Sequence, residues 1–155
     1  MEGVFVTRAA AKTGINPIAL IAIEQYYPQK QRIVEDDLAY RMLPAGSRII
    51  VKLMKPNWVR NWMINLSEKS LPGIWGGMLC RKRYVDDKLI ESVEHEHIDA
   101  VINLGAGFDT RAYRLSALPG LPIWEVDQLE IIDSKRDRLL KTFRTILSNI
   151  DLVPI

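Results

Sequence analysis

The sequence has very few of the residues that build disulfides or metal centres. It contains one cysteine, Cys80, and two histidines, His95 and His97, among 155 residues. A single cysteine cannot form an intrachain disulfide, so a reducing compartment is the default expectation. The two histidines stand two positions apart, which on a helix points them to different sides rather than toward one metal ion. We therefore predict no metal site.

Long apolar runs and a strong charge of one sign are also absent. No segment approaches the roughly 18 consecutive apolar residues of a membrane span, and the N-terminus, MEGVFVTRAAAKTG, lacks the apolar stretch of a secretory signal. The formal net charge of +2 is too small to indicate a nucleic-acid partner. With 48% apolar and 26% charged residues, the composition is typical of a soluble globular protein, which we expect in the cytoplasm.

An apolar stripe at helical spacing, with basic residues nearby, is the one hint of a membrane surface. Its members are Trp58, Trp62, Met63 and Leu66. Such a stripe can lie on lipid, but it is more often the face of a helix that packs on a core. We therefore do not expect a membrane partner.

The chain changes character near residue 98. Before it, the patterns are helical, beginning at residues 16–27, where Asn16 is a suitable N-cap and Pro17 occupies the first helical position. A short helix before Pro44, two helical pieces on either side of Pro56, and a long helix over about 74–96 follow. These patterns predict a helical region over residues 1–97.

From residue 98 onward, strand and helix patterns alternate. Segments 98–105, 121–127 and 150–155 are expected strands, and helical patterns occupy 109–118 and 131–149. Strands that alternate with helices of this length predict βαβ units and a parallel sheet. The fold class is therefore α/β, with the sheet in residues 98–155.

The stretch VINLGAGFDT, residues 101–110, places two glycines directly after the first expected strand. Glycine lets the backbone approach a ligand where a side chain would collide, so Gly105, Ala106 and Gly107 form a candidate nucleotide-binding turn. Asp127 ends the next strand, 22 residues after Gly105, near the spacing at which a carboxylate meets ribose hydroxyls. A plain tight turn beside a polar strand end is the alternative, and the two features together argue against it.

Asp109 bears on which nucleotide the turn would take. The dehydrogenase fingerprint has a small residue where Thr110 stands, and it presents a helix N-terminus to a pyrophosphate. A carboxylate in the turn would repel phosphate, whereas it suits the ammonium and sulfonium groups of S-adenosylmethionine (SAM). The charges favour SAM over NAD, with an NAD(P)-binding oxidoreductase as the alternative. Asp109 could equally cap the helix that begins at Thr110.

The runs INLGAGFDTRAYRL and WEVDQLEIIDSKRDRL resemble the SAM-binding core of the leucine carboxyl methyltransferase-like family. KTGINPIALIAIEQ, RIVEDDLAYRML and RKRYVDDKL are similar to helices of that family, so the resemblance covers nearly the whole chain. It implies a helical cap region over 1–97, followed by a partial Rossmann-like class I methyltransferase domain over 98–155. The implied activity is transfer of a methyl group from SAM to an oxygen of a carboxylate or small-molecule hydroxyl acceptor.

The resemblance also implies roles for single residues. Residues 105–107 would line the methionine part of SAM, and Asp127 would hold the ribose. Arg83 would pair with the methionine carboxylate, which suits its two-pronged guanidinium, unless it forms a surface ion pair with an aspartate three or four positions on. Lys12 matches a family lysine that reaches the same end of SAM. No catalytic base is identified.

Finally, the resemblance implies a larger sheet in which the first strand is central. The sequence reaches only about the third strand, so we expect it to be an N-terminal portion that carries half of the cofactor site. The alternatives are an inactive form or a non-catalytic subunit that another chain completes. The far edge of the first strand would lack a neighbour, and a second copy of the chain could pair with it.

Overall fold

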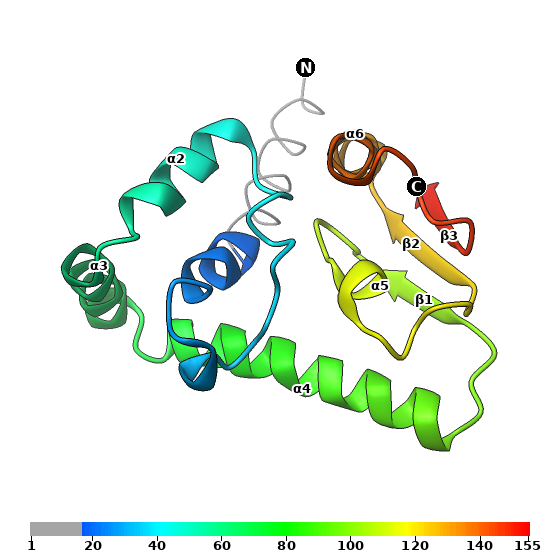
Figure 1. The fold of residues 1–155 in the computed structure, drawn as a ribbon, viewed down its shortest axis with the longest axis horizontal. Coiled ribbons are helices and arrows are strands. Elements are labelled where there is room, and N and C mark those ends of the chain that lie inside the picture. Colours follow the sequence, from blue (N-terminus) through cyan, green and yellow to red (C-terminus); the bar gives the residue numbers. More distant parts are fainter. Residues whose placement is uncertain (1–16) are drawn as a thin grey trace.

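In a computed structural model that describes residues 17–155, the regular elements between residues 17 and 95 are helices, and strands alternate with helices after residue 100 (Figure 1). The helical half comprises residues 17–24, η1 (Gln29–Gln31), α2 (Ala45–Leu53), α3 (Asn57–Ser70) and α4 (Ile74–His95). Pro44 and Pro56 precede α2 and α3 directly, at φ values of −60° and −66°, because proline's fixed φ suits a helix start. The expected long helix over 74–96 is confirmed.

The prediction of a helix before Pro44 was wrong. Residues 37–42 form turns, in which the Leu38 and Ala39 N–H groups donate to the Asp36 carboxylate at 3.2 and 2.9 Å. The side chain of Asp36 thus accepts the first N–H groups of a turn, as an N-cap does for a helix. Pro44 disfavours a helical conformation of the residue before it, so the turns do not continue into a regular helix.

The second half forms a parallel sheet, as expected. Its elements are β1 (Val101–Leu104), α5 (Arg111–Arg114), β2 (Ile123–Asp127), α6 (Leu129–Phe143) and β3 (Ile150–Pro154). The strand order is β1-β2-β3 with both pairs parallel, so the α/β Rossmann-like prediction is confirmed. Two helices are shorter than the pattern predicted: α5 is one turn because Leu115 is extended, and α6 ends where Arg144 takes a left-handed conformation at φ 65°.

The two halves share one apolar core. Ile21, Met42 and Leu79 from the helical half are buried together with Phe108 and Leu139 from the second half. The boundary predicted near residue 98 therefore separates two patterns of secondary structure that pack on each other, and its role as a domain boundary stays a prediction.

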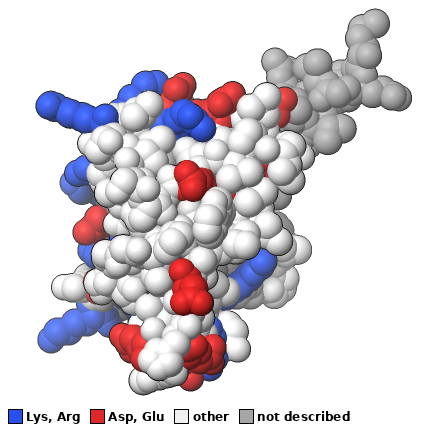
Figure 2. Space-filling view, turned by 90° about the vertical axis from the view of Figure 1, so that its right-hand side faces the viewer, with Lys and Arg blue, Asp and Glu red and all other residues white. Residues whose placement is uncertain are grey.

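The sheet has one covered face and one open face. Ile123 and Ile150 are buried under the helices, whereas Ile102 and Leu104 are 65% and 75% exposed on the other face of β1. In the described sheet, β1 pairs only with β2, and self-association through its outer edge stays a prediction. Seen from the side (Figure 2), most of the surface is uncharged, with isolated acidic side chains in its middle and more of them at the lower end.

The apolar stripe of α3 does not pack on the core as expected. Trp58 and Trp62 are 76% and 61% exposed, and Met63 alone of the stripe packs against the core. The buried side chain of α3 is instead Arg60, whose guanidinium lies 4.2 Å from the centre of the Tyr27 ring. Among residues 17–155, none of the helices combines the length and the apolar content needed to cross a membrane.

A buried ion pair joins β2 to α6. The Lys135 Nζ lies 2.8 Å from the Glu125 Oε1, and the two side chains are 0% and 1% exposed. Burial raises the pKa of Glu125, although the Lys135 ammonium opposes that shift. Because neither charge can reach water, each depends on the other for compensation.

We predict that Lys135→Met destabilises the protein by about 3–5 kcal/mol, because it leaves the Glu125 carboxylate buried without a partner. The free energy of unfolding in urea, followed by circular dichroism, measures the loss. Lys141→Met removes an exposed ammonium from the same helix and should change that free energy by no more than about 0.5 kcal/mol. Equal effects of the two substitutions would contradict the importance of the buried pair.

Candidate functional site

The glycine turn is built into the hydrogen bonding of the sheet. Gly105 and Gly107 have φ values of +67° and +50°, which favour glycine because a Cβ is strained there. The N–H groups of Gly105 and Ala106 both donate to the Val126 carbonyl of β2, at 2.9 and 3.1 Å. No heavy atom lies within 4 Å of a Cβ built on Gly105, so its backbone conformation requires glycine, while the space beside it is open.

The Asp127 carboxylate faces this turn from the tip of β2. Its Oδ2 accepts the Gly107 N–H at 2.7 Å, and its Oδ1 accepts the Gln128 N–H at 2.7 Å. A carboxylate oxygen can accept more than one hydrogen bond. The arrangement thus leaves Asp127 able to accept hydroxyl donors from a ligand beside the turn.

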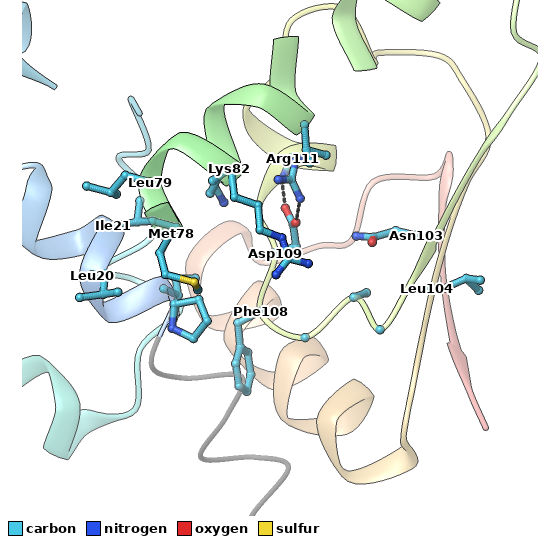
Figure 3. A pocket seen from close by; sticks show the side chains of 17 residues that line it. Leu20, Ile21, Met78, Leu79, Lys82, Asn103, Leu104, Phe108, Asp109 and Arg111 are labelled. Carbon is cyan, nitrogen blue, oxygen red and sulfur yellow. Dashed lines mark hydrogen bonds and ion pairs between the residues drawn. The ribbon is translucent and has the colours of Figure 1, made fainter. Parts of the chain in front are cut away.

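A cavity of about 390 Å³ lies between the turn, the helix at residues 17–24 and the first half of α4. Apolar side chains such as Ile21, Met78 and Leu79 line it on the helical side (Figure 3). Residues 103–109 line it on the sheet side. Of the predicted ligands, Gly105, Ala106, Gly107 and Asp109 line this cavity, whereas Asp127 and Arg83 do not.

Asp109 is ionised and compensated at the cavity wall. Its carboxylate faces Arg111 (Figure 3), whose backbone N–H donates to Oδ1 at 2.8 Å and whose guanidinium pairs with Oδ2. Burial alone would raise the pKa of Asp109, but the charges of Lys82, Arg111 and Lys135, together with the hydrogen bond from the Arg111 N–H, lower the pKa. Asp109 therefore accepts a backbone N–H from the first turn of α5 and also lines the cavity. Because nearby cations compensate the charge of Asp109, its carboxylate repels a phosphate less strongly than the sequence alone suggests.

The basic side chains of α4 lie on different sides of the helix, and Arg83 is on the side away from the cavity. Arg83 is 57% exposed, and its Nε lies 2.7 and 2.8 Å from the two carboxylate oxygens of Asp87. This is the surface ion pair that sequence reasoning held as the alternative, and a cofactor role for Arg83 stays a prediction. Lys12 lies outside the described residues.

Sequence reasoning missed two cations of α4 that line the cavity, Arg81 and Lys82. With Met78 and Val85 they follow a spacing of three, four and seven residues along α4, so all four share one flank of the helix. That spacing is the feature of the sequence from which their common position on the helix could have been predicted.

Two buried carboxylates support the turn from the side of the helices. The Asp86 Oδ1 accepts a hydrogen bond from the Arg111 Nε at 2.6 Å, and its Oδ2 pairs with Arg114. The Thr110 hydroxyl, at the N-cap of α5, donates to the Asp36 Oδ2 at 2.6 Å. Asp36, Asp86 and Thr110 are each at most 3% exposed, so these contacts fix the segment after the glycine turn.

Comparison with known protein families matches residues 15–155 to leucine carboxyl methyltransferase. The chain belongs to this family. A protein of Mycobacterium avium (strain 104) is 27% identical over 108 residues, which are 69% of this chain and 35% of that protein. A protein of Mycobacterium ulcerans (strain Agy99) is 29% identical over the same shares of the two chains.

A second Mycobacterium avium protein is 44% identical over 59 residues, which are 38% of this chain and 19% of that protein. All three relatives carry the name "Putative S-adenosyl-L-methionine-dependent methyltransferase". The chain thus matches about a third of the length of the first two relatives, and the predicted family membership is confirmed.

We predict that Gly105→Ala destabilises the protein by about 1–2 kcal/mol, because alanine is strained at positive φ. Gly77→Ala is the matched control: Gly77 lies inside α4, with no heavy atom within 4 Å of its added Cβ. Alanine there should stabilise the protein by about 0.5–1 kcal/mol. Thermal unfolding followed by circular dichroism measures both changes, and a Gly105→Ala protein as stable as the unaltered one would show that the turn is not strained.

Proposed function

We propose that this chain provides the SAM-binding turn of an O-methyltransferase. The observation that carries the proposal is the glycine turn after β1, faced by the Asp127 carboxylate through the 2.7 Å hydrogen bond from the Gly107 N–H. Membership in the leucine carboxyl methyltransferase family supports the same conclusion. Because the chain matches about a third of its relatives, the activity of the whole protein is part of the proposal.

Residues at the glycine turn and in the cavity fit the groups of SAM. Asp127 accepts hydrogen bonds from the ribose hydroxyls, as an ionised carboxylate at a strand tip can. The methionine end lies in the cavity beside residues 105–107, with its ammonium near Asp109. Arg81, which lines the cavity, pairs with the methionine carboxylate through two parallel hydrogen bonds. This role falls to Arg81 because the Arg83 guanidinium is paired with Asp87.

These residues contribute chiefly by holding and orienting SAM. When bound, SAM supplies a methyl group that is already activated by its sulfonium. The chain's own residues then fix the direction of the methyl group toward the acceptor oxygen, and such positioning accounts for much of the rate of a two-reactant step. A carboxylate acceptor is ionised and needs no base, whereas a hydroxyl acceptor must lose its proton to one.

The alternative of an NAD(P) oxidoreductase has less support. The place of the third small residue in the dinucleotide fingerprint is taken by Thr110, whose hydroxyl is committed to Asp36. The relatives reported above are named methyltransferases. A non-catalytic subunit that needs a partner remains the second candidate, since the chain matches only 35% of the first relative.

We predict that SAM and its demethylated product, S-adenosylhomocysteine, each raise the melting temperature of the chain, whereas NADH does not. Ligand that binds only the folded state stabilises it by mass action. Differential scanning fluorimetry with each ligand measures the shift. A shift with NADH alone would favour the oxidoreductase, and no shift with any ligand would favour the partner-dependent subunit.

We further predict that Arg81→Ala and Asp127→Ala each weaken SAM binding at least about tenfold, which is about 1.4 kcal/mol. Isothermal titration calorimetry measures the dissociation constants. Arg83→Ala is the informative comparison, because Arg83 lies two positions from Arg81 but pairs with Asp87 outside the cavity. A tenfold loss at Arg83 with none at Arg81 would restore the assignment that the resemblance implies.

A further inference from the structure

We propose that Asp36 is a positioning residue for the glycine turn and that its charge makes the cavity favour SAM over the demethylated product. The inference rests on the proposed function and adds to it a residue far from the turn in sequence, together with a basis for discrimination between the two ligands. Asp36 itself does not line the cavity.

The contacts of Asp36 join three parts of the molecule. Its Oδ1 accepts N–H groups from the turn at residues 38–39, while its Oδ2 accepts the Thr110 hydroxyl at 2.6 Å. The same Oδ2 lies 3.3 Å from the Lys82 Nζ and 3.5 Å from the Arg114 Nε. With a side chain that is 0% exposed, Asp36 has no water to replace these partners. It therefore fixes both the N-cap of α5 and the ammonium of Lys82.

Charges in this part of the molecule are balanced. The cluster holds three carboxylates and three cations, all with side chains at most 17% exposed: Asp36, Asp86, Asp109, Lys82, Arg111 and Arg114. Loss of the Asp36 charge would leave one positive charge in excess. Because Lys82 and Arg111 line the cavity, that excess would act directly on a bound ligand.

The two ligands respond differently to such a charge. Each carries an ammonium and a carboxylate, but SAM has a sulfonium in addition, so its net charge is +1, while the demethylated product is neutral. An excess positive charge at the cavity wall therefore repels SAM and leaves the product nearly unaffected. With Asp36 in place, the six charges of this cluster balance, so that Asp109 can attract the cationic end of SAM.

The test is calorimetric titration of SAM and S-adenosylhomocysteine into the unaltered chain and three variants. Asp36→Asn should weaken SAM binding at least about tenfold and product binding by less than about threefold. Thr110→Val keeps the charge and loses the hydrogen bond, so it should weaken both ligands equally. Glu91→Gln removes an exposed carboxylate from the far part of α4 and should change neither. Equal weakening of both ligands by Asp36→Asn would overturn the electrostatic role.

A measurement without ligand tests the positioning role separately. Amide hydrogen exchange over residues 105–111 should become faster in Asp36→Asn and in Thr110→Val, while exchange in α6 stays unchanged. Unchanged exchange at the turn in both variants would overturn the positioning role. If the unaltered chain bound neither ligand, the proposed function would fail along with the discrimination it supports, whereas the exchange result would still decide whether Asp36 positions the turn. Should Asp36→Asn fail to fold, Thr110→Val gives that decision.

Discussion

The cavity beside the glycine turn depends on the compensation of buried carboxylates. Asp36 and Asp86 are almost completely inaccessible to water, and an uncompensated charge at such a site would cost several kcal/mol. Their partners come from α4 and from the segment after the turn: Lys82, Arg111 and Arg114. The Asp86 carboxylate is compensated by two arginines of α5, Arg111 and Arg114, so the helical half of the chain must lie against α5. The requirement for charge compensation thus places the helices and the sheet so that a cavity is left between them.

The turn itself is held from two directions. On the sheet side, the Val126 carbonyl and the Asp127 carboxylate accept three consecutive N–H groups, those of residues 105–107. On the helical side, Asp36 holds Thr110, and Asp86 holds Arg111. A ligand that binds here would meet a backbone already in its final conformation, which reduces the ordering cost of binding. The shared apolar core, with Phe108 packed between the two halves, adds to this rigidity.

Local patterns in the sequence were sufficient for the order of strands and helices after residue 98 and for the turn with Asp127, because strand periodicity, glycine and strand-end residues act over short distances. They did not show that Arg81, rather than Arg83, lines the cavity. Both lie in one run of basic residues, and the inward flank of α4 is determined by what it packs on. Arg60 illustrates the same limit: the apolar stripe of α3 suggested one buried face, but the arginine stacked on Tyr27 defines another. The role of Asp36 could not be predicted from local patterns, since its partner Thr110 is distant in the sequence.

That distance has a consequence for how the molecule reaches its native state. The hydrogen bond between Thr110 and Asp36 joins residues 74 positions apart, and closing a loop of this length has an entropic cost before any contact compensates for it. Single helices such as α4 need no such closure. We therefore expect the cavity to be completed late in folding, so that a newly made chain would acquire secondary structure before it could hold a ligand.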